Sequence, residues 1–344
     1  MSTSNRFHFL DSLRGFAVAG ILLVNAADLM CLGHDVPVRP FQTIPLAENV
    51  LNFLVATRFV PIFSFMFGMS MGFVIDSAIR RGAPAWKILL RRLAALLVIG
   101  LLHSILYPGE ILRDYAVVGA ILLPFVLKVP RSVRLVLGLL ATIGAYAFTG
   151  GGALSLPGLF LLGSAAQAYD LPARLEHADR RIGAATLVFA AASAAAIPWQ
   201  AAEGGDPRFF TAGGVAGGLM ACLYVCLLAL LWRTPVRRAL SAVFEPLGRM
   251  ALTCYVTASV VMVPAGLLLD SRSTQDVIPG LIVAAAVLPI QWVFCRLWLS
   301  RFAYGPLEWV WRCITWWRWI PLQRPQSKRL DPVSSAPTTT DGIA

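Results

Sequence analysis

Long apolar runs alternate with short polar segments along most of the chain. The hydrocarbon core of a bilayer is about 30 Å thick, so a helix that rises 1.5 Å per residue needs roughly 20 mostly apolar residues to cross it. Hydropathy predicts ten membrane-spanning helices, near residues 15–32, 59–76, 93–109, 111–128, 132–149, 152–169, 182–202, 211–232, 250–269 and 278–299. The run 152–169 is short and contains Pro157, so hydropathy alone leaves it open between a span and a re-entrant loop.

The distribution of Lys and Arg decides between these two topologies. Cytoplasmic loops collect basic residues, whereas acidic residues contribute little to orientation. With the amino terminus inside and ten spans, 24 of the 29 Lys and Arg residues fall on the inner side. If 152–169 did not cross, every later loop would change sides, and Arg233 to Arg249 would face outward. We therefore predict ten spans with both termini in the cytoplasm.

The start of the chain has a second interpretation, a cleaved signal peptide. Arg6, Arg14 and a short apolar run precede Val24-Asn25-Ala26, which resembles a small-residue cleavage site. The apolar run continues past Asn25, and this favours a membrane span.

The end of the chain has its own composition. Six of the ten tryptophans lie between Trp298 and Trp319 and alternate with arginines, a mixture that prefers the headgroup layer. Residues 306–320 are predicted to form an interfacial helix on the cytoplasmic leaflet. The Ser-, Thr- and Pro-rich tail, 324–344, is predicted to be disordered, which leaves 1–323 as a single transmembrane domain.

Composition supports this fold class and excludes others. Hydrophobic residues make up 58% of the chain and charged residues 14%, whereas soluble proteins have about 45–50% apolar residues with glycine included and about 25% charged residues. The sequence therefore predicts an all-α polytopic membrane protein with the lipid bilayer as its first partner. The net charge of +11 would indicate nucleic acid in a soluble chain, but here it reflects topology. The sequence has no CxxC, HExxH or Gly-rich phosphate loop, so no metal is expected.

His103 is the strongest candidate for chemistry. It lies inside a predicted span, eleven residues or about 16 Å from Arg92, and ionisable residues at such depth usually face a cavity or a partner. The short turn that follows carries Glu110 and Asp114, and it folds both carboxylates back towards His103. A carboxylate bonded to one ring nitrogen would make the other a better general base. The structural alternatives are a neutral histidine bonded to a neighbouring helix and a solvated loop.

Other polar residues mark the two ends of the bundle. Asn25 and Asp28 share one face near the outer end of the first span, and His34 follows in the first outer loop, where it would either line the same cavity or be an ordinary surface histidine. At the inner end, arginine is expected from topology alone, but it also suits phosphate binding. The residues expected there are Asp11, Arg14, Arg91, Arg92 and Arg249.

Five segments of the chain resemble one family. They are RFHFLDSLRGFAVAGILLVN (6–25), FSFMFGMSMGF (63–73), RRLAALLVIGLLHSILYPGEILRDYAVVGAILLPF (91–125), LGRMALTCYV (247–256) and YGPLEWVWRCITW (304–316). Their order and content resemble the YeiB-like branch of the transmembrane acyltransferase superfamily, whose members include heparan-α-glucosaminide N-acetyltransferase and bacterial envelope O-acyltransferases. The resemblance covers nearly the whole chain.

The resemblance implies acyl transfer from a cytoplasmic acyl-CoA, most simply acetyl-CoA, to a hydroxyl or amine of an envelope glycan or related metabolite. Residues of this chain that match the family's motifs are Asp11, Arg14, Asn25, His103, Glu110, Tyr115, Arg249, Thr253, Tyr255, Gly305, Pro306, Glu308 and Arg312. Two positions differ from the branch, which usually has Asp at 110 and Asn at 254. In the lysosomal relative the active histidine lies in the loop after the first span, which would favour His34 as the base.

We therefore expect an acyltransferase of the bacterial cytoplasmic membrane. His103, oriented by Glu110, would be the base, Asn25 or Tyr115 would stabilise the oxyanion, and Arg14, Arg91, Arg92 and Arg249 would hold the acyl-CoA phosphates. The sequence also allows a transporter for a small anion or metabolite with a buried proton relay, or an inactive scaffold. It leaves room for a homo-oligomer.

Overall fold

The computed structural model describes residues 6–36, 45–177 and 180–323, and the regular elements in these ranges are helices. The only extended pairing within them is an isolated bridge between Phe302 and Gln323. The predicted all-α fold is therefore confirmed. The tail predicted to be disordered, 324–344, lies outside the described residues.

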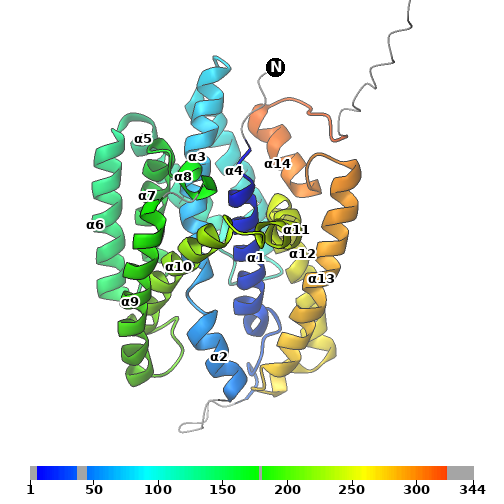
Figure 1. Ribbon diagram of the computed structural model, residues 1–344. Coiled ribbons are helices and arrows are strands. Elements are labelled where there is room, and N and C mark those ends of the chain that lie inside the picture. The colour runs from blue at the N-terminus through cyan, green and yellow to red at the C-terminus, as the bar shows by residue number, and fades with distance from the viewer. Residues whose placement is uncertain (1–5, 37–44, 178–179, 324–344) are drawn as a thin grey trace, which may run out of the picture.

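Each predicted span corresponds to one longer helix (Figure 1). These helices are α1 (His8–Leu29), α3 (Phe59–Arg80), α4 (Ala85–Ser104), α5 (Leu112–Lys128), α6 (Arg131–Thr149), α7 (Leu156–Ala168), α9 (Arg180–Glu203), α10 (Thr211–Leu231), α12 (Ala251–Leu268) and α13 (Ile278–Arg301). The predicted interfacial segment contains α14 (Pro306–Trp316). Three shorter helices were not predicted: α2 (Leu46–Leu54), α8 (Leu171–His177) and α11 (Arg237–Arg249).

The described residues contain seven segments long and apolar enough to cross a bilayer, which makes the chain a polytopic membrane protein. They are α1, the stretch Leu46–Arg80 that includes α2 and α3, α6, α9, α10, α12 and α13. The other three predicted spans fall short by length or charge. α4 carries three basic residues in its first half, α5 has 17 residues and α7 has 13. Their crossing of the membrane stays a prediction.

The position of α7 supports its assignment as a crossing helix. Gly150, which ends α6 and begins the segment leading into α7, packs against Phe210, the residue before α10. At the end of α7, the Ala168 carbonyl accepts a hydrogen bond of 2.9 Å from Arg131, the first residue of α6. The segment from Gly150 to Ala168 therefore runs antiparallel to α6 from one end of that helix to the other, the arrangement expected of a span.

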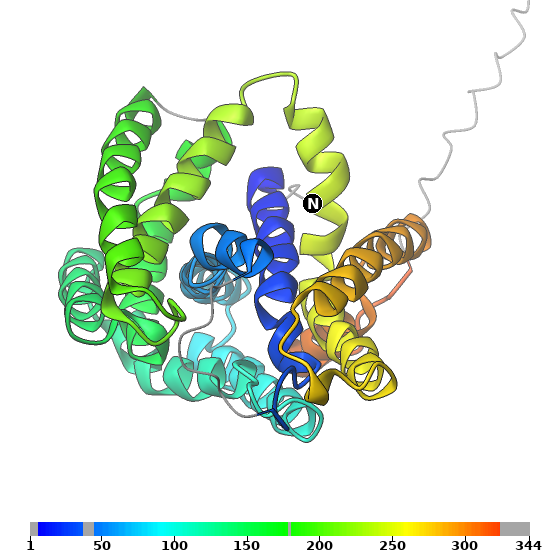
Figure 2. The ribbon, with the colours of Figure 1, turned by 90° about the horizontal axis from the view of Figure 1, so that it is seen from below.

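Helix α1 forms the centre of the bundle (Figures 1 and 2). In its most apolar stretch 61% of the residues are buried, against 11% for α6 at the periphery. Two glycines explain the tight contact between α1 and α11. A Cβ atom on Gly15 would overlap the Phe244 carbonyl, and one on Gly248 would overlap the Asp11 carbonyl. The backbones meet at this crossing because neither residue has a side chain.

The two ends of the bundle contain different elements. We call one the basic end; it contains the starts of α1 and α4, the end of α11, and α14. The opposite, distal end contains α2, the loop 204–210 and the turn Ser271–Ser273. Helix α14 is fixed at the basic end by Trp311, whose indole donates a 2.8 Å hydrogen bond to the Arg92 carbonyl of α4.

Candidate functional site

His103 and Glu110 form a buried, hydrogen-bonded pair near the distal end of α4. The His103 Nδ1 atom lies 2.6 Å from Glu110 Oε2, and the two side chains are 2% and 0% exposed. The short segment between α4 and α5 brings Glu110 back onto His103, as the turn predicted. It does not bring Asp114, which instead pairs with Arg113 on the surface.

Both oxygens of Glu110 are engaged. Oε2 contacts the histidine, and Oε1 accepts a hydrogen bond from the backbone N–H of Leu112 at the start of α5. The carboxylate is therefore held in one orientation. When Nδ1 carries the proton that Glu110 accepts, Nε2 of a neutral imidazole is the basic nitrogen. His103 Nε2 is buried and has no hydrogen-bond partner among the described residues.

Tyr255 of α12 is the second feature of this site. Its ring centroid lies 5.2 Å from that of His103. Its hydroxyl is also buried; the Ile111 backbone lies close to it, but it makes no well-formed hydrogen bond within the described part of the chain. Since most buried polar atoms in proteins are hydrogen-bonded, two such polar groups on rings in contact indicate a place where a ligand or water binds.

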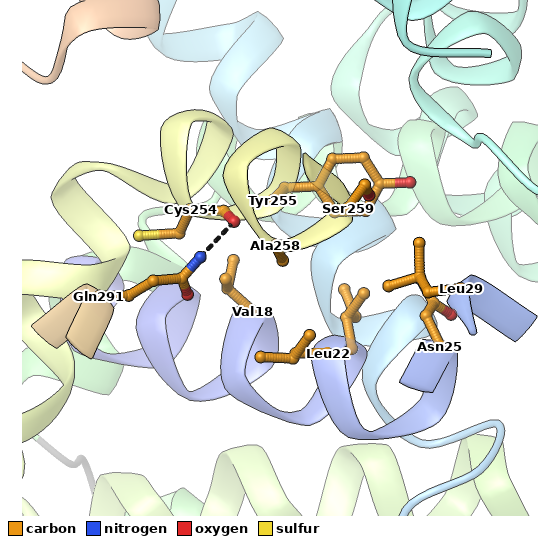
Figure 3. A pocket seen from close by; sticks show the side chains of 10 residues that line it. Val18, Leu22, Asn25, Leu29, Cys254, Tyr255, Ala258, Ser259 and Gln291 are labelled. Atoms are coloured by element: carbon orange, nitrogen blue, oxygen red, sulfur yellow. Dashed lines mark hydrogen bonds between the residues drawn. The ribbon is translucent and has the colours of Figure 1, made fainter. Parts of the chain in front are cut away.

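A small cavity between α1, α12 and α13 lies beside Tyr255 (Figure 3). Asn25, Tyr255, Ser259 and Gln291 supply its polar lining. Its volume of about 10 Å³ is the space for roughly one water-sized sphere. Because Tyr255 both lines this cavity and contacts His103, it connects Asn25 of the first span to the His103–Glu110 pair.

Tyr115 and His34 have other surroundings. The Tyr115 hydroxyl lies 2.6 Å from Ser64 Oγ, and its ring packs against Phe67 and Phe160. His34 is exposed in the loop after α1, beside Asp35. A hydrogen bond from Arg272 lowers the pKa of Asp35 and joins this loop to the α12–α13 turn. Within the described ranges, neither Tyr115 nor His34 has a hydrogen bond or ring contact with His103.

Asp28 is also engaged elsewhere. Its carboxylate lies 2.5 Å from the guanidinium of Arg208 in the loop between α9 and α10. The ion pair ties the distal end of α1 to that loop, next to the cavity.

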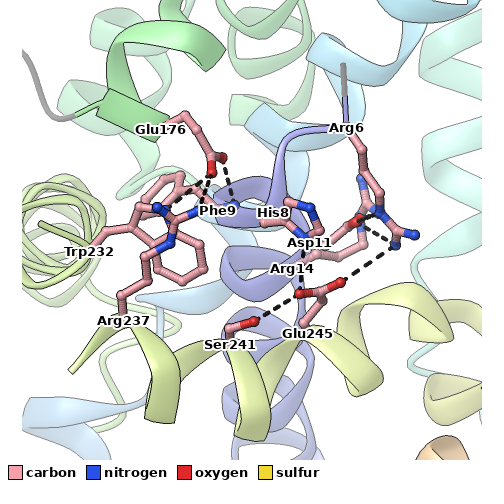
Figure 4. Close-up of polar contacts among 10 residues, drawn as sticks. All are labelled: Arg6, His8, Phe9, Asp11, Arg14, Glu176, Trp232, Arg237, Ser241 and Glu245. Atoms are coloured by element: carbon pink, nitrogen blue, oxygen red, sulfur yellow. Dashed lines mark hydrogen bonds and ion pairs between the residues drawn. The ribbon is translucent and has the colours of Figure 1, made fainter. Parts of the chain in front are cut away.

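The predicted basic residues gather at the basic end. Arg14 donates weakly to Asp11 at 3.3 Å and to the Gly248 carbonyl at 3.4 Å, and Asp11 also pairs with Arg6 at 2.7 Å (Figure 4). Arg249 donates to the Ala303 carbonyl at 3.4 Å. Asp11 is thus part of a network of ion pairs rather than a free acceptor.

The remaining two predicted arginines stack on tryptophans of the C-terminal region. The Arg92 guanidinium lies 3.6 Å from the Trp311 ring centroid and donates to Ser70 Oγ at 3.1 Å. Arg91 lies 5.3 Å from the centroid of Trp317. Neighbours in sequence therefore point at different partners.

One face of α1 joins the two regions. Arg14, Val18, Asn25 and Leu29 follow one another at spacings that place them on a single stripe, and the last three line the cavity. Eleven residues separate Arg14 from Asn25, a rise of about 16 Å. Val18, the first of the three cavity residues, is only four residues after Arg14, so the cavity begins about one helical turn beyond the basic end.

The family resemblance includes Tyr255 among the matched residues but gives it no role. A tyrosine hydroxyl in the middle of an apolar span is itself a signal, because polar groups at that depth need a partner. Its contact with His103 depends on how α4 and α12 pack, which hydropathy does not reveal. Among the described residues no group of three His, Cys, Asp or Glu side chains is placed to hold a metal ion.

Comparisons with known proteins find relatives along nearly the whole chain. A family model described as "Protein of unknown function (DUF418)" matches residues 170–318, from α8 to the end of α14. An "Uncharacterized 39.9 kDa protein in amylase 3'region" of Bacillus acidopullulyticus is 30% identical over 342 residues, covering 94% of this chain and 97% of that protein. "Uncharacterized protein YxaH" of Bacillus subtilis (strain 168) is 28% identical over 404 residues, with the same coverage of both chains. No solved structure matches.

Proposed function

The chain belongs to the DUF418 family of YeiB-like membrane proteins, and on that premise we propose that it is an integral-membrane acyltransferase. It moves an acyl group, most simply acetyl, from acyl-CoA to a hydroxyl or amine of an envelope glycan or related metabolite. The observation that carries the proposal is the buried His103–Glu110 pair, which leaves one imidazole nitrogen free to accept a proton. The sequence motifs that resemble the acyltransferase superfamily supply the reaction class.

The proposed reaction begins with proton transfer from the acceptor hydroxyl to His103 Nε2. The acceptor oxygen forms a bond to the thioester carbonyl carbon, and Glu110 stabilises the resulting imidazolium. When the tetrahedral intermediate collapses, the carbon–sulfur bond breaks and the departing thiolate takes the proton back from Nε2. A positioned general base of this kind contributes a factor of roughly 10² to 10⁴ to the rate.

Asn25 and Tyr255 are the proposed oxyanion donors. Both line the same cavity, and the Tyr255 ring contacts His103. Preorganised donors in a site without bulk water stabilise the developing negative charge strongly. Tyr115, the alternative donor from the sequence, is less suited because its hydroxyl is engaged with Ser64.

Acyl-CoA would enter from the basic end, which the positive-inside rule assigns to the cytoplasm. Its phosphates would bind the arginines there, and its acyl arm would follow the stripe on α1 from Arg14 towards Asn25. The cavity has room for only about one water-sized sphere, so α1 and α12 must separate when the arm enters. Bacterial relatives are consistent with a cytoplasmic membrane location.

The test is acyl transfer by the purified protein in proteoliposomes, with labelled acetyl-CoA and a panel of envelope glycans and small metabolites. We expect label to move with the wild type and a loss of roughly 10²- to 10⁴-fold in His103→Ala. His177→Ala is a matched control, because His177 is exposed on α8 and should keep full activity.

Two results would overturn the assignment. Full transfer by His103→Ala together with loss in His34→Ala would move the base to the outer loop. Substrate uptake without consumption of acyl-CoA would favour the transporter with a proton relay.

A further inference from the structure

Two arginines come together where α14 packs on α4. Arg92 stacks on Trp311 at 3.6 Å, and the Trp311 indole donates to the Arg92 backbone carbonyl at 2.8 Å. This double contact fixes α14 against α4 and brings Arg312, the residue after Trp311, close enough for its charge to act on Arg92.

A third arginine approaches from α1. The charge of Arg14 also acts on Arg92, and Arg14 is held by the carbonyl of Gly248 in α11. Three helices that are far apart in the sequence therefore place guanidinium groups around one region. We call Arg14, Arg92 and Arg312 the arginine cluster.

A fourth arginine, Arg249, is linked to the cluster through Ala303 and Tyr304. Arg249, the residue after Gly248, donates to the Ala303 carbonyl. The Arg312 guanidinium lies 4.8 Å from the ring centroid of the next residue, Tyr304. Arg249 and Arg312 are thus positioned by neighbouring residues.

Two carboxylates lie near the cluster, and among the described residues neither forms an ion pair with Arg92 or Arg312. Asp11 is shared between Arg14 and Arg6. Glu308 lies one helical turn before Arg312, but its carboxylate accepts hydrogen bonds from the Leu252 and Thr253 backbone N–H groups and from the Thr253 hydroxyl, at 2.6–3.0 Å. It caps α12 and is not paired with the cluster.

The charge of the cluster is therefore poorly compensated. Like charges at close range repel, and the repulsion is stronger where water is excluded. Arg312 Nε is buried without a hydrogen-bond partner among the described residues. Guanidinium groups bind phosphate oxygens through paired hydrogen bonds, so an anion with several oxygens would relieve both the repulsion and the unpaired donor.

We propose that Arg14, Arg92 and Arg312 form a binding site for a phosphate-bearing ligand. The identification of that ligand as acyl-CoA rests on the proposed function, whereas the phosphate chemistry rests on the cluster alone. The site adds Arg312 to the arginines expected from the sequence. A nucleotide diphosphate or the headgroup of an anionic lipid offers the same oxygens, and the experiment separates these two sources.

The experiment measures binding without turnover. Coenzyme A, which has no acyl group to transfer, is titrated into the full-length protein in neutral-lipid nanodiscs, and inorganic pyrophosphate is added as a competitor. Loss of one charge-assisted hydrogen bond weakens binding by roughly 10- to 100-fold. We expect that loss in Arg92→Gln and in Arg312→Gln, and competition by pyrophosphate with the wild type.

Two further variants guard against trivial results. Arg81→Gln removes the same charge from the basic end, where Arg81 stacks on Trp316 at 4.3 Å, and should change coenzyme A affinity by less than about two-fold because Arg81 lies outside the cluster. Arg312→Lys keeps the charge but loses the planar pair of donors, so it should bind with intermediate affinity even if the Gln variant folds poorly.

The outcomes distinguish the site from the function. Coenzyme A binding that depends on Arg92 and Arg312 but not on Arg81 supports a nucleotide diphosphate. If coenzyme A does not bind, the binding of labelled phosphatidylglycerol to the protein in nanodiscs decides. If the wild type binds more pyrophosphate-displaceable labelled lipid than Arg312→Gln does, the phosphate site stands and the acyl-CoA proposal fails. Equal binding by the wild type, Arg92→Gln and Arg312→Gln overturns the site.

Discussion

At the residue scale, Glu110 shows how one side chain serves both folding and the proposed chemistry. One oxygen accepts the Leu112 backbone N–H at the start of α5, and the other contacts His103. An N-terminal carboxylate also interacts favourably with the helix dipole. The orientation of His103 is therefore set by the same bond network that begins the next helix.

Tyr255 and Tyr115 give a prediction with a built-in contrast. Tyr255→Phe keeps the ring against His103 and removes only a hydroxyl that makes no well-formed hydrogen bond with the described residues, so the free energy of unfolding should stay within about 0.5 kcal/mol. Acyl transfer should fall by roughly 10²- to 10³-fold, the usual cost of losing an oxyanion donor. Tyr115→Phe breaks the bond to Ser64 and should cost about 0.5–1.5 kcal/mol of stability with transfer largely kept.

Thermal unfolding in detergent and initial rates with labelled acetyl-CoA measure the two effects on the same preparations. A Tyr255→Phe protein that loses stability but transfers acyl groups at the wild-type rate would make Tyr255 a packing residue.

Whether the sequence could predict a contact depends on how many residues separate the two partners along the chain. His103 and Glu110 are seven residues apart, so a short turn was enough to pair them. Arg58 shows the opposite case: nothing near it in the sequence indicates a partner, but it is completely buried and donates to Gln200 of α9 at 2.7 Å. A contact across 142 residues depends on helix packing and leaves no local pattern.

At the element scale, hydropathy located ten helices and missed α2, α8 and α11. Length explains the misses, because α2 has nine residues, α8 has seven and α11 has 13, all below the length that a span needs. Helix α11 also has charged residues at both ends, which made it resemble a loop. It is nevertheless the helix that packs tightly on α1 and positions Arg14.

The crossing of α1 and α11 gives a prediction about packing. In Gly248→Val the new side chain would overlap the Asp11 backbone, and overpacking of this kind costs about 1–3 kcal/mol. We expect a lower melting temperature in detergent and, because Arg14 is held by the Gly248 carbonyl, weaker coenzyme A binding. Gly183→Ala is the control: Gly183 lies in α9 with open space around it, and alanine should raise helix stability by about 1 kcal/mol. Unchanged melting of Gly248→Val would contradict the close approach of the two helices.

At the scale of the whole molecule, the charge distribution and the packing point to the same topology. Glu176, which follows α7, accepts hydrogen bonds from the Phe9 backbone N–H at the start of α1 and from the Trp232 indole after α10. Arg237 also pairs with it at 3.3 Å (Figure 4). The segments after α7 and α10 therefore meet the start of α1 at one end of the molecule, the arrangement that the count of basic residues requires.

Reporter fusions test this topology where it is most sensitive. With α7 crossing, the loop that contains Asp206 lies on the outer side and Arg233 on the inner side, since α10 connects them. Alkaline phosphatase fused after Asp206 should be active and a fluorescent protein fused there should be dark, whereas fusions after Arg233 should behave in the opposite way. A fusion after Gly82, in the turn between α3 and α4, is the internal standard, because its inner location does not depend on α7. If the fusions after Asp206 and Arg233 exchange their behaviour while Gly82 keeps its own, α7 does not cross, and the arginines after α10 face away from any cytoplasmic acyl-CoA.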